Sequence, residues 1–180
     1  MNVIKSSLIG FITFILIIIN LTIGFGILAI VNIPRIIIPF NAFKIALSKF
    51  SNVLGDLTVY GLKLIMLLMH GNTIQLIGNH DNFDKTKWYM AMSNHQSWAD
   101  IFVLLVSANH KIPLLKFFMK KELAWIPFIF LANKTLNMPF VNRHSKDAIE
   151  KDPSLRMKDY KNTIKSCKRF LRSPSTIFSY

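Results

Sequence analysis

Two apolar stretches occupy most of the first seventy residues. The first runs from residue 6 to residue 34 without a charged side chain, and its core, Leu8 to Val31, would form about 36 Å of helix. Because a hydrocarbon core is about 30 Å thick, this stretch predicts a transmembrane helix at about residues 8–31, with Pro34 and Pro39 ending it. A cleaved secretory leader fits less well, since its apolar region is only about 7–15 residues long.

The second stretch, Val53 to Met69, contains charged residues as well. On a helix, its polar side chains fall on one stripe made of Asp56, Tyr60, Lys63 and His70, and its leucines lie away from that stripe. This pattern predicts an amphipathic helix over residues 53–69 that lies on a membrane or against the domain, and not a second span. We place a boundary near residue 70, with a membrane anchor at 1–70 and a separate domain at 71–180.

Short, largely apolar runs bounded by turn residues follow the boundary. They predict strands at Ile74 to Ile77, at Trp88 to Met92, at about Ile112 to Leu115 and at Ser175 to Tyr180. Helices are expected at about residues 101–108 and over residues 154–172. The second of these has an apolar stripe made of Met157, Tyr160, Ile164, Cys167 and Leu171. We therefore interpret Cys167 as a core residue and not as a reactive thiol.

The composition indicates a membrane surface. Apolar residues make up 52% of the chain and charged residues only 17%, which is more apolar than a typical soluble domain. The 22 Lys and Arg against 9 Asp and Glu give a net charge of +13, and such a basic protein suits anionic lipid headgroups. No recognised nucleic-acid motif accompanies this charge, so we expect no nucleic-acid partner.

The positions of individual residues predict orientation and limit the chemistry. Only Lys5 precedes the first apolar stretch, whereas Arg35, Lys44 and Lys49 follow it, so the positive-inside rule places the chain after residue 34 on the cytoplasmic side. The single Cys167 rules out an internal disulfide. The five histidines have no His or Cys partners at metal-ligand spacing, so we expect no metal site.

One connection carries candidate chemistry. The strand predicted at Trp88 to Met92 is followed by polar residues and then by an apolar helix, and His95 and Asp100 lie on this turn. A histidine takes and returns a proton near neutral pH, and a carboxylate bonded to one ring nitrogen leaves the other free as a base. The bare pair would arise by chance in about one chain in five, so the spacing alone favours an accidental or structural pair.

The longer string Asn94-His95-Gln96-Ser97-Trp98-Ala99-Asp100 resembles the first motif of the glycerolipid acyltransferases, most closely the bacterial branch related to lysophosphatidic acid acyltransferase. The resemblance implies an α/β fold with a central mixed sheet flanked by helices, preceded here by the transmembrane helix and the amphipathic helix. It also implies that His95 removes a proton from the hydroxyl of a lysophospholipid that attacks an acyl thioester, while Asp100 holds the ring. Asn94 or backbone amides would stabilise the oxyanion. Acyl-CoA or acyl carrier protein would be the donor, with no bound cofactor.

Two further segments resemble the same family, in the same order. Residues 117–127 have basic residues before Glu-Leu and a Trp-x-Pro after it, which gives Lys116 or Lys120 a share in binding the substrate phosphate; solvated lysines on a helix are an equal alternative. Residues 138–143 resemble the second motif, an apolar strand that ends in arginine. The resemblance assigns Arg143 to the glycerol phosphate, which a guanidinium binds in a bidentate way. Asn142 stands where family members often have a second basic residue.

In the family, the C-terminal strand leads into a Glu-Gly-Thr-Arg turn, which this sequence does not contain. We therefore interpret residues 71–180 as the N-terminal part of the catalytic domain, truncated before that motif. Two hypotheses follow. In the first, the chain is an O-acyltransferase of phospholipid biosynthesis or remodelling at the bacterial inner membrane, with its catalytic part facing the cytoplasm. In the second, it is an inactive remnant or a lipid-binding module at the membrane surface.

Overall fold

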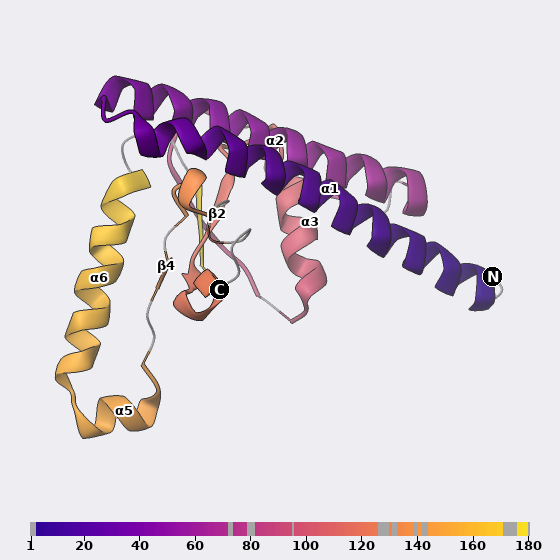
Figure 1. Ribbon diagram of the computed structural model, residues 1–180. Coiled ribbons are helices and arrows are strands. Elements are labelled where there is room, and N and C mark those ends of the chain that lie inside the picture. Colours follow the sequence, from indigo (N-terminus) through magenta and orange to yellow (C-terminus); the bar gives the residue numbers. More distant parts are fainter. Residues whose placement is uncertain are drawn as a thin grey trace.

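The computed structural model describes residues 3–71, 74–78, 82–94, 96–125, 130, 133–138, 140–141, 144–170 and 176–179. The protein is mostly helical, with a small sheet. Two long helices, α1 (Val3–Ile37) and α2 (Asn41–His70), run side by side along one face of the molecule, and the remaining elements lie on the other side of them (Figure 1). By length and apolar composition, each of the two helices could span a membrane.

Small residues and polar contacts join α1 to α2. A Cβ atom added at Gly24 would collide with Thr58, and one added at Gly61 would collide with the Asn20 side chain, so both glycines allow a close approach of the helices. Asn20 Nδ2 donates to the backbone carbonyl of Thr58 at 2.9 Å. Most of the large apolar side chains on both helices remain exposed, including Ile4 at 83%. The pair is therefore held together on its inner side and presents an apolar surface outward.

The bounds of both helices differ from the expected ones. The helix expected at about residues 8–31 is α1, which continues through Pro34 and ends at Ile37. Pro34 has no backbone N–H to donate, but its carbonyl still accepts from the Ile38 amide at 2.9 Å, so the prediction that Pro34 ends the helix was wrong. The helix expected over residues 53–69 is the second half of α2. The break between the two helices falls at Pro39.

A buried cluster joins these helices to the rest of the chain. Leu28 of α1 and Val59 of α2 pack with Leu114 and Leu136, which both follow residue 70 in the sequence. Gly55 also lies against Leu114, since a Cβ there would meet its side chain. The segments on the two sides of the expected boundary therefore share a core. The boundary itself stays a prediction.

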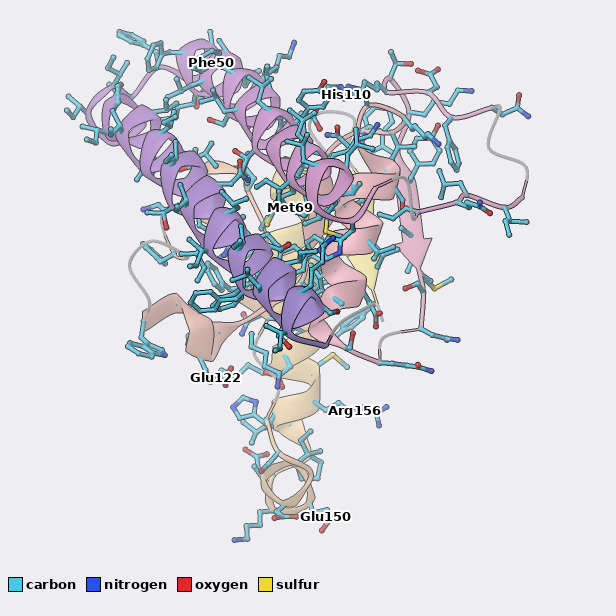
Figure 2. The ribbon with its side chains drawn as sticks, turned by 90° about the vertical axis from the view of Figure 1, so that its right-hand side faces the viewer. Phe50, Met69, His110, Glu122, Glu150 and Arg156 are labelled. Carbon is cyan, nitrogen blue, oxygen red and sulfur yellow. The ribbon has the colours of Figure 1, made fainter. Side chains whose placement is uncertain are left out.

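Polar contacts continue this attachment along α2. Asn137 Nδ2 donates to Ser48 Oγ at 2.6 Å, and Asn109 Nδ2 donates to the Asp56 carbonyl at 3.1 Å. Lys85 Nζ lies 3.6 Å from Asp56 Oδ2. Phe50 and Met69 mark positions toward opposite ends of the helix in Figure 2. One face of α2 is thus covered by the domain and another packs against α1, so only the remaining side of the helix is open to a further contact.

The sheet is built from parallel strands. Strand β5 (Thr176–Ser179) lies between β1 (Tyr89–Met92) and β2 (Leu115–Phe117), and a separate pair is formed by β3 (Met119–Lys120) and β4 (Phe140–Val141). Every pair that the described residues form is parallel, so they do not contain the mixed arrangement that we expected. The connections agree with this, because parallel strands need a long crossover: helix α3 (Trp98–Ala108) lies between β1 and β2 in the chain, and α5 (Lys146–Lys151) and α6 (Ser154–Phe170) lie between β2 and β5.

The strand predictions met with different outcomes. Strands predicted near residues 88–92 and 175–180 are present as β1 and β5. The strand expected at Ile112 to Leu115 lies later, as β2, because Leu114 is taken up by the cluster under α2. Residues 74–77 form no strand; Ile74 and Leu76 instead line a hollow beside α2.

Helix α6 does not bury the face that its apolar stripe predicted. Met157 and Tyr160 are 56% and 62% exposed, whereas Leu155, Asp159 and Thr163 are half-buried. This second face lies inward, where Asp159 binds His144, three residues after the end of β4. Cys167 is half-buried at the edge of this face, and burial raises the pKa of its thiol, which agrees with an unreactive cysteine.

Candidate active site

The first sequence motif lies at the carboxyl end of β1. Strand β1 ends at Met92, the turn follows, and α3 begins at Trp98. The register aligns Tyr89 and Leu115 with Thr176, so the three parallel strands begin level with one another. Their carboxyl ends therefore meet at one edge of the sheet, which is the usual position of a ligand site in such sheets.

Asp100 holds this turn from inside the first turn of α3. Its Oδ2 atom accepts the backbone N–H of Gln96 at 2.6 Å and that of Ser97 at 2.8 Å. Ser97 Oγ accepts the N–H of Ala99 at 3.2 Å and also that of Asp100, which together with the Asp100 bond to the Ser97 amide forms a capping box. The first four N–H groups of a helix have no partner within the helix, so Ser97 and Asp100 together determine where α3 begins.

His95 lies outside the described residues, and its contact with Asp100 therefore stays a prediction. The Asp100 carboxylate binds the amide of Gln96, the residue directly after His95 in the sequence. Asn94, on the other side of His95, is exposed.

The two candidate lysines occupy different environments. Lys116 lies on β2 and is 1% exposed, whereas Lys120 lies on β3 and is exposed. Neither residue is on a regular α-helix, so the alternative of solvated lysines on a helix does not describe them. A lysine that binds a substrate phosphate must be reached by it, and this requirement favours Lys120.

The strand of the second motif lies beside Lys120. In the β3–β4 pair, Lys120 is the register partner of Val141. Asn142 and Arg143 lie outside the described residues, but Arg143 follows Val141 by only two positions in the sequence. Arg143 thus follows the strand beside Lys120 in the sequence, and its place in a site with Lys120 stays a prediction.

A histidine–aspartate contact that the sequence did not reveal involves the residue directly after this motif. His144 Nδ1 is 2.9 Å from both carboxylate oxygens of Asp159, and the His144 backbone N–H donates to Asp159 Oδ2 at 3.1 Å. These hydrogen bonds hold the pKa of the Asp159 carboxyl below its ordinary value. No spacing rule connects residues this far apart; the one available signal was that His144 follows Arg143.

One hollow lies away from the motif residues. It has a volume of about 350 Å³ between α2, residues 74–76 and the carboxyl end of α3, with apolar walls and with Lys63 and Lys111 among its lining residues. It is at the end of α3 opposite to Asp100. Among the described residues, no group of three or more His, Cys, Asp or Glu side chains could hold a metal ion.

The sequence comparison agrees with this geometry. A family model described as Acyltransferase matches residues 76–178, which is more than half of the chain. The matched segment begins after α2 and includes both motifs, together with the strands and helices from β1 to β5. No curated protein and no solved structure matches the chain.

Proposed function

We propose that this chain, which belongs to the acyltransferase family, transfers a fatty acyl group from a thioester to the free hydroxyl of a lysophospholipid at a membrane surface. The donor is acyl-CoA or acyl carrier protein, and the reaction belongs to phospholipid biosynthesis or remodelling. The observation that carries the proposal is the position of the first motif at the carboxyl edge of the parallel sheet, with Asp100 binding the amide directly after His95.

In the proposed reaction, His95 takes the proton of the lysophospholipid hydroxyl as its oxygen forms a bond to the thioester carbonyl carbon. The C–S bond then breaks, and the thiol leaves with the proton that the imidazolium returns. General-base assistance of this kind contributes about a hundred- to ten-thousand-fold to the rate. Asp100 orients the turn and stabilises the imidazolium.

Asn94 is the best candidate for stabilising the oxyanion. The N–H groups of Gln96 and Ser97 are bound by Asp100, and that of Ala99 is bound by Ser97, so these amides at the helix start already have acceptors. The Asn94 side chain is exposed on the same turn. An amide N–H directed at the developing charge is the kind of donor that such a step requires.

Lys120 and Arg143 bind the substrate phosphate in this proposal. Lys120 supplies an exposed ammonium group, and Arg143 supplies a planar guanidinium that can bind two phosphate oxygens. The pairing of Lys120 with Val141 supports a shared site, since the strand beside Lys120 leads into Arg143. The phosphate would then be held on the segments that border the sheet, and the hydroxyl would face His95.

The pair α1 and α2 attaches the domain to the lipid. Its outward side chains are large and apolar, among them Ile30 at 66% and Leu68 at 75% exposure, and the net charge of +13 favours anionic headgroups. Because α1 and α2 run side by side (Figure 1) and the domain covers one face of α2 at Ser48 and Asp56, we place the outward side of the helix pair in the lipid and the face of α2 with Ser48 and Asp56 toward the domain. The proposed location is the bacterial inner membrane, with the domain on the cytoplasmic side.

Incorporation of a labelled acyl chain into lysophosphatidic acid tests the function. Membranes that contain the protein should acylate this acceptor, and His95→Ala should reduce the rate to that of membranes without the protein. Acceptors with choline in the headgroup or without a phosphate should react more slowly if Lys120 and Arg143 bind a phosphate monoester. If the unaltered protein gives no more product than His95→Ala, the enzyme hypothesis fails, and the alternative of an inactive remnant or a lipid-binding module takes its place.

A further inference from the structure

Asp159 holds both the backbone and the ring of a single residue. Its Oδ2 atom accepts the His144 backbone N–H at 3.1 Å, and both of its oxygens lie 2.9 Å from His144 Nδ1. The side chains are 15% exposed for Asp159 and 32% for His144. A contact to the ring alone would leave the chain free to move, whereas a bond to the amide fixes the backbone of His144 relative to α6.

The segment that includes Arg143 is therefore bounded by two fixed points. Before it, Val141 is paired with Lys120 in the β3–β4 ladder. After it, His144 is bound by Asp159, and Ser145 caps α5 by accepting the Ala148 N–H at 3.2 Å. Consecutive Cα atoms are about 3.8 Å apart, so fixing His144 also limits where the backbone of Arg143 can lie.

We propose that Asp159 is a positioning residue for substrate binding: through His144 it holds the backbone that presents Arg143 to the phosphate of the lysophospholipid. This inference rests on the proposed function. A flexible arginine loses conformational freedom when it binds a phosphate, and a backbone fixed in advance reduces that cost. The effect belongs to binding and not to the chemical step, because neither Asp159 nor His144 acts on the reacting hydroxyl or thioester.

Among the described residues, no carboxylate of the short helix α5 binds a backbone N–H of the segment before it. In Figure 2, Glu150 marks α5 at the end of the molecule remote from α1 and α2, and Arg156 marks α6, one turn before Asp159. Asp147 lies on α5 and is exposed. It provides a matched control, because it is an aspartate near the same segment for which the proposal requires no role.

The first measurement compares KM for lysophosphatidic acid with kcat. Asp159→Ala should raise KM about tenfold, the size expected for loss of a charge-assisted hydrogen bond, and leave kcat unchanged. Asp159→Asn keeps a carbonyl oxygen that can accept the His144 N–H, so its KM should lie between those of the unaltered protein and Asp159→Ala. Asp147→Ala should leave both constants unchanged. An unchanged KM in folded Asp159→Ala, or a loss in kcat in place of the rise in KM, would overturn the proposal.

A double-variant comparison separates positioning from general destabilisation. If Asp159 acts through Arg143, adding Asp159→Ala to Arg143→Ala should raise KM no further, because the side chain being positioned is already absent. A further rise by the same factor would show that Asp159 acts independently and would overturn the inference. If Arg143→Ala alone leaves KM unchanged while His95→Ala abolishes the reaction, the proposed acyltransferase function is kept and the positioning role of Asp159 is rejected. If His95→Ala has no effect, the proposed function itself fails.

Discussion

Two aspartates hold the two turns of the candidate site in the same way, but from different distances along the chain. Asp100 accepts the N–H groups of Gln96 and Ser97, within four residues of itself. Asp159 accepts the N–H of His144 across fifteen residues. In both cases, the carboxylate binds the amide directly after a proposed functional residue, since Gln96 follows His95 and His144 follows Arg143.

The difference between the two turns lies in what each needs in order to form. The capping box at Ser97 and Asp100 forms together with the first turn of α3 and requires no other element. The contact between Asp159 and His144 forms only when α6 packs back onto β4, with α5 between them in the sequence. The first turn is a local structure, and the second depends on tertiary packing. Partial unfolding that separates α6 from β4 should therefore weaken the proposed phosphate binding before it disturbs the proposed catalytic turn.

The largest expected effect separates the two histidines. His95→Ala should lower kcat by about a hundred- to ten-thousand-fold, because it removes the proposed general base. His144→Ala should leave kcat within about threefold of the unaltered protein, since its backbone N–H can still bind Asp159. Rates of labelled acyl transfer to lysophosphatidic acid at saturating acceptor measure both. Equal losses in the two variants would show that an aspartate neighbour does not distinguish a catalytic histidine from a structural one.

Asp100→Asn tests whether the local carboxylate does more than start the helix. The amide side chain of asparagine can still accept a backbone N–H, so α3 should still form, but it carries no charge to stabilise the imidazolium. We expect kcat to fall on the order of a hundredfold or more, with KM for lysophosphatidic acid unchanged. Circular dichroism provides the folding control. A kcat close to that of the unaltered protein would show that Asp100 only caps the helix and that its charge does not contribute to catalysis.

The sequence predicted the local turn because its signals are local. A strand, a polar turn and an apolar helix were expected in this order, and the structure has them, although α3 begins at Trp98 and not at about residue 101. For the same reason, β5 was placed almost correctly from six residues. The capping box of Ser97 and Asp100 was not predicted. The family match over residues 76–178 confirms the resemblance that the motif suggested.

The remaining errors concern contacts between distant segments. The stripe at Met157 and Tyr160 is apolar in the sequence but exposed in the structure. Helix α6 instead turns Asp159 inward, where it binds His144 after the end of β4. No periodicity along α6 could show that partner. Likewise, nothing in the run near residue 114 showed that Leu114 would pack under α1 and α2. The roles of Asn94, Lys120 and Arg143 stay predictions.

Ser97→Ala sharpens the comparison at a smaller scale. The substitution removes the hydroxyl that accepts the Ala99 N–H at 3.2 Å, and the loss of such a cap costs about 1 kcal/mol of folding free energy. The Asp100 bonds to Gln96 and to the residue 97 amide remain possible, so kcat should change by less than about threefold. Thermal unfolding in detergent measures the stability, and the acylation assay measures kcat. A loss of activity as large as that of Asp100→Asn would show that the cap itself orients His95.

The smallest expected effect is an acid dependence of the tertiary contact. Hydrogen bonds from His144 hold the pKa of Asp159 below its ordinary value. A carboxyl whose pKa is lower in the folded than in the unfolded state stabilises the fold above its unfolded pKa of about 3.9, and this contribution is lost as the pH falls through the folded pKa. The Tm difference between the unaltered protein and Asp159→Asn should therefore be steady down to about pH 5 and shrink below about pH 4.

Asp147→Asn, at an exposed position on α5, is the control for acid effects that do not involve the contact. A difference between the unaltered protein and Asp159→Asn that persists unchanged to pH 3 would mean that the Asp159 charge does not stabilise the fold. The bond to the His144 amide would then act without its charge, and the second turn would resemble a neutral cap. A difference that shrinks only in Asp159→Asn shows that the charge of one carboxylate on α6 stabilises the fold through its tertiary contact with His144, whereas the capping box of the first turn is formed within α3 and its own N-cap.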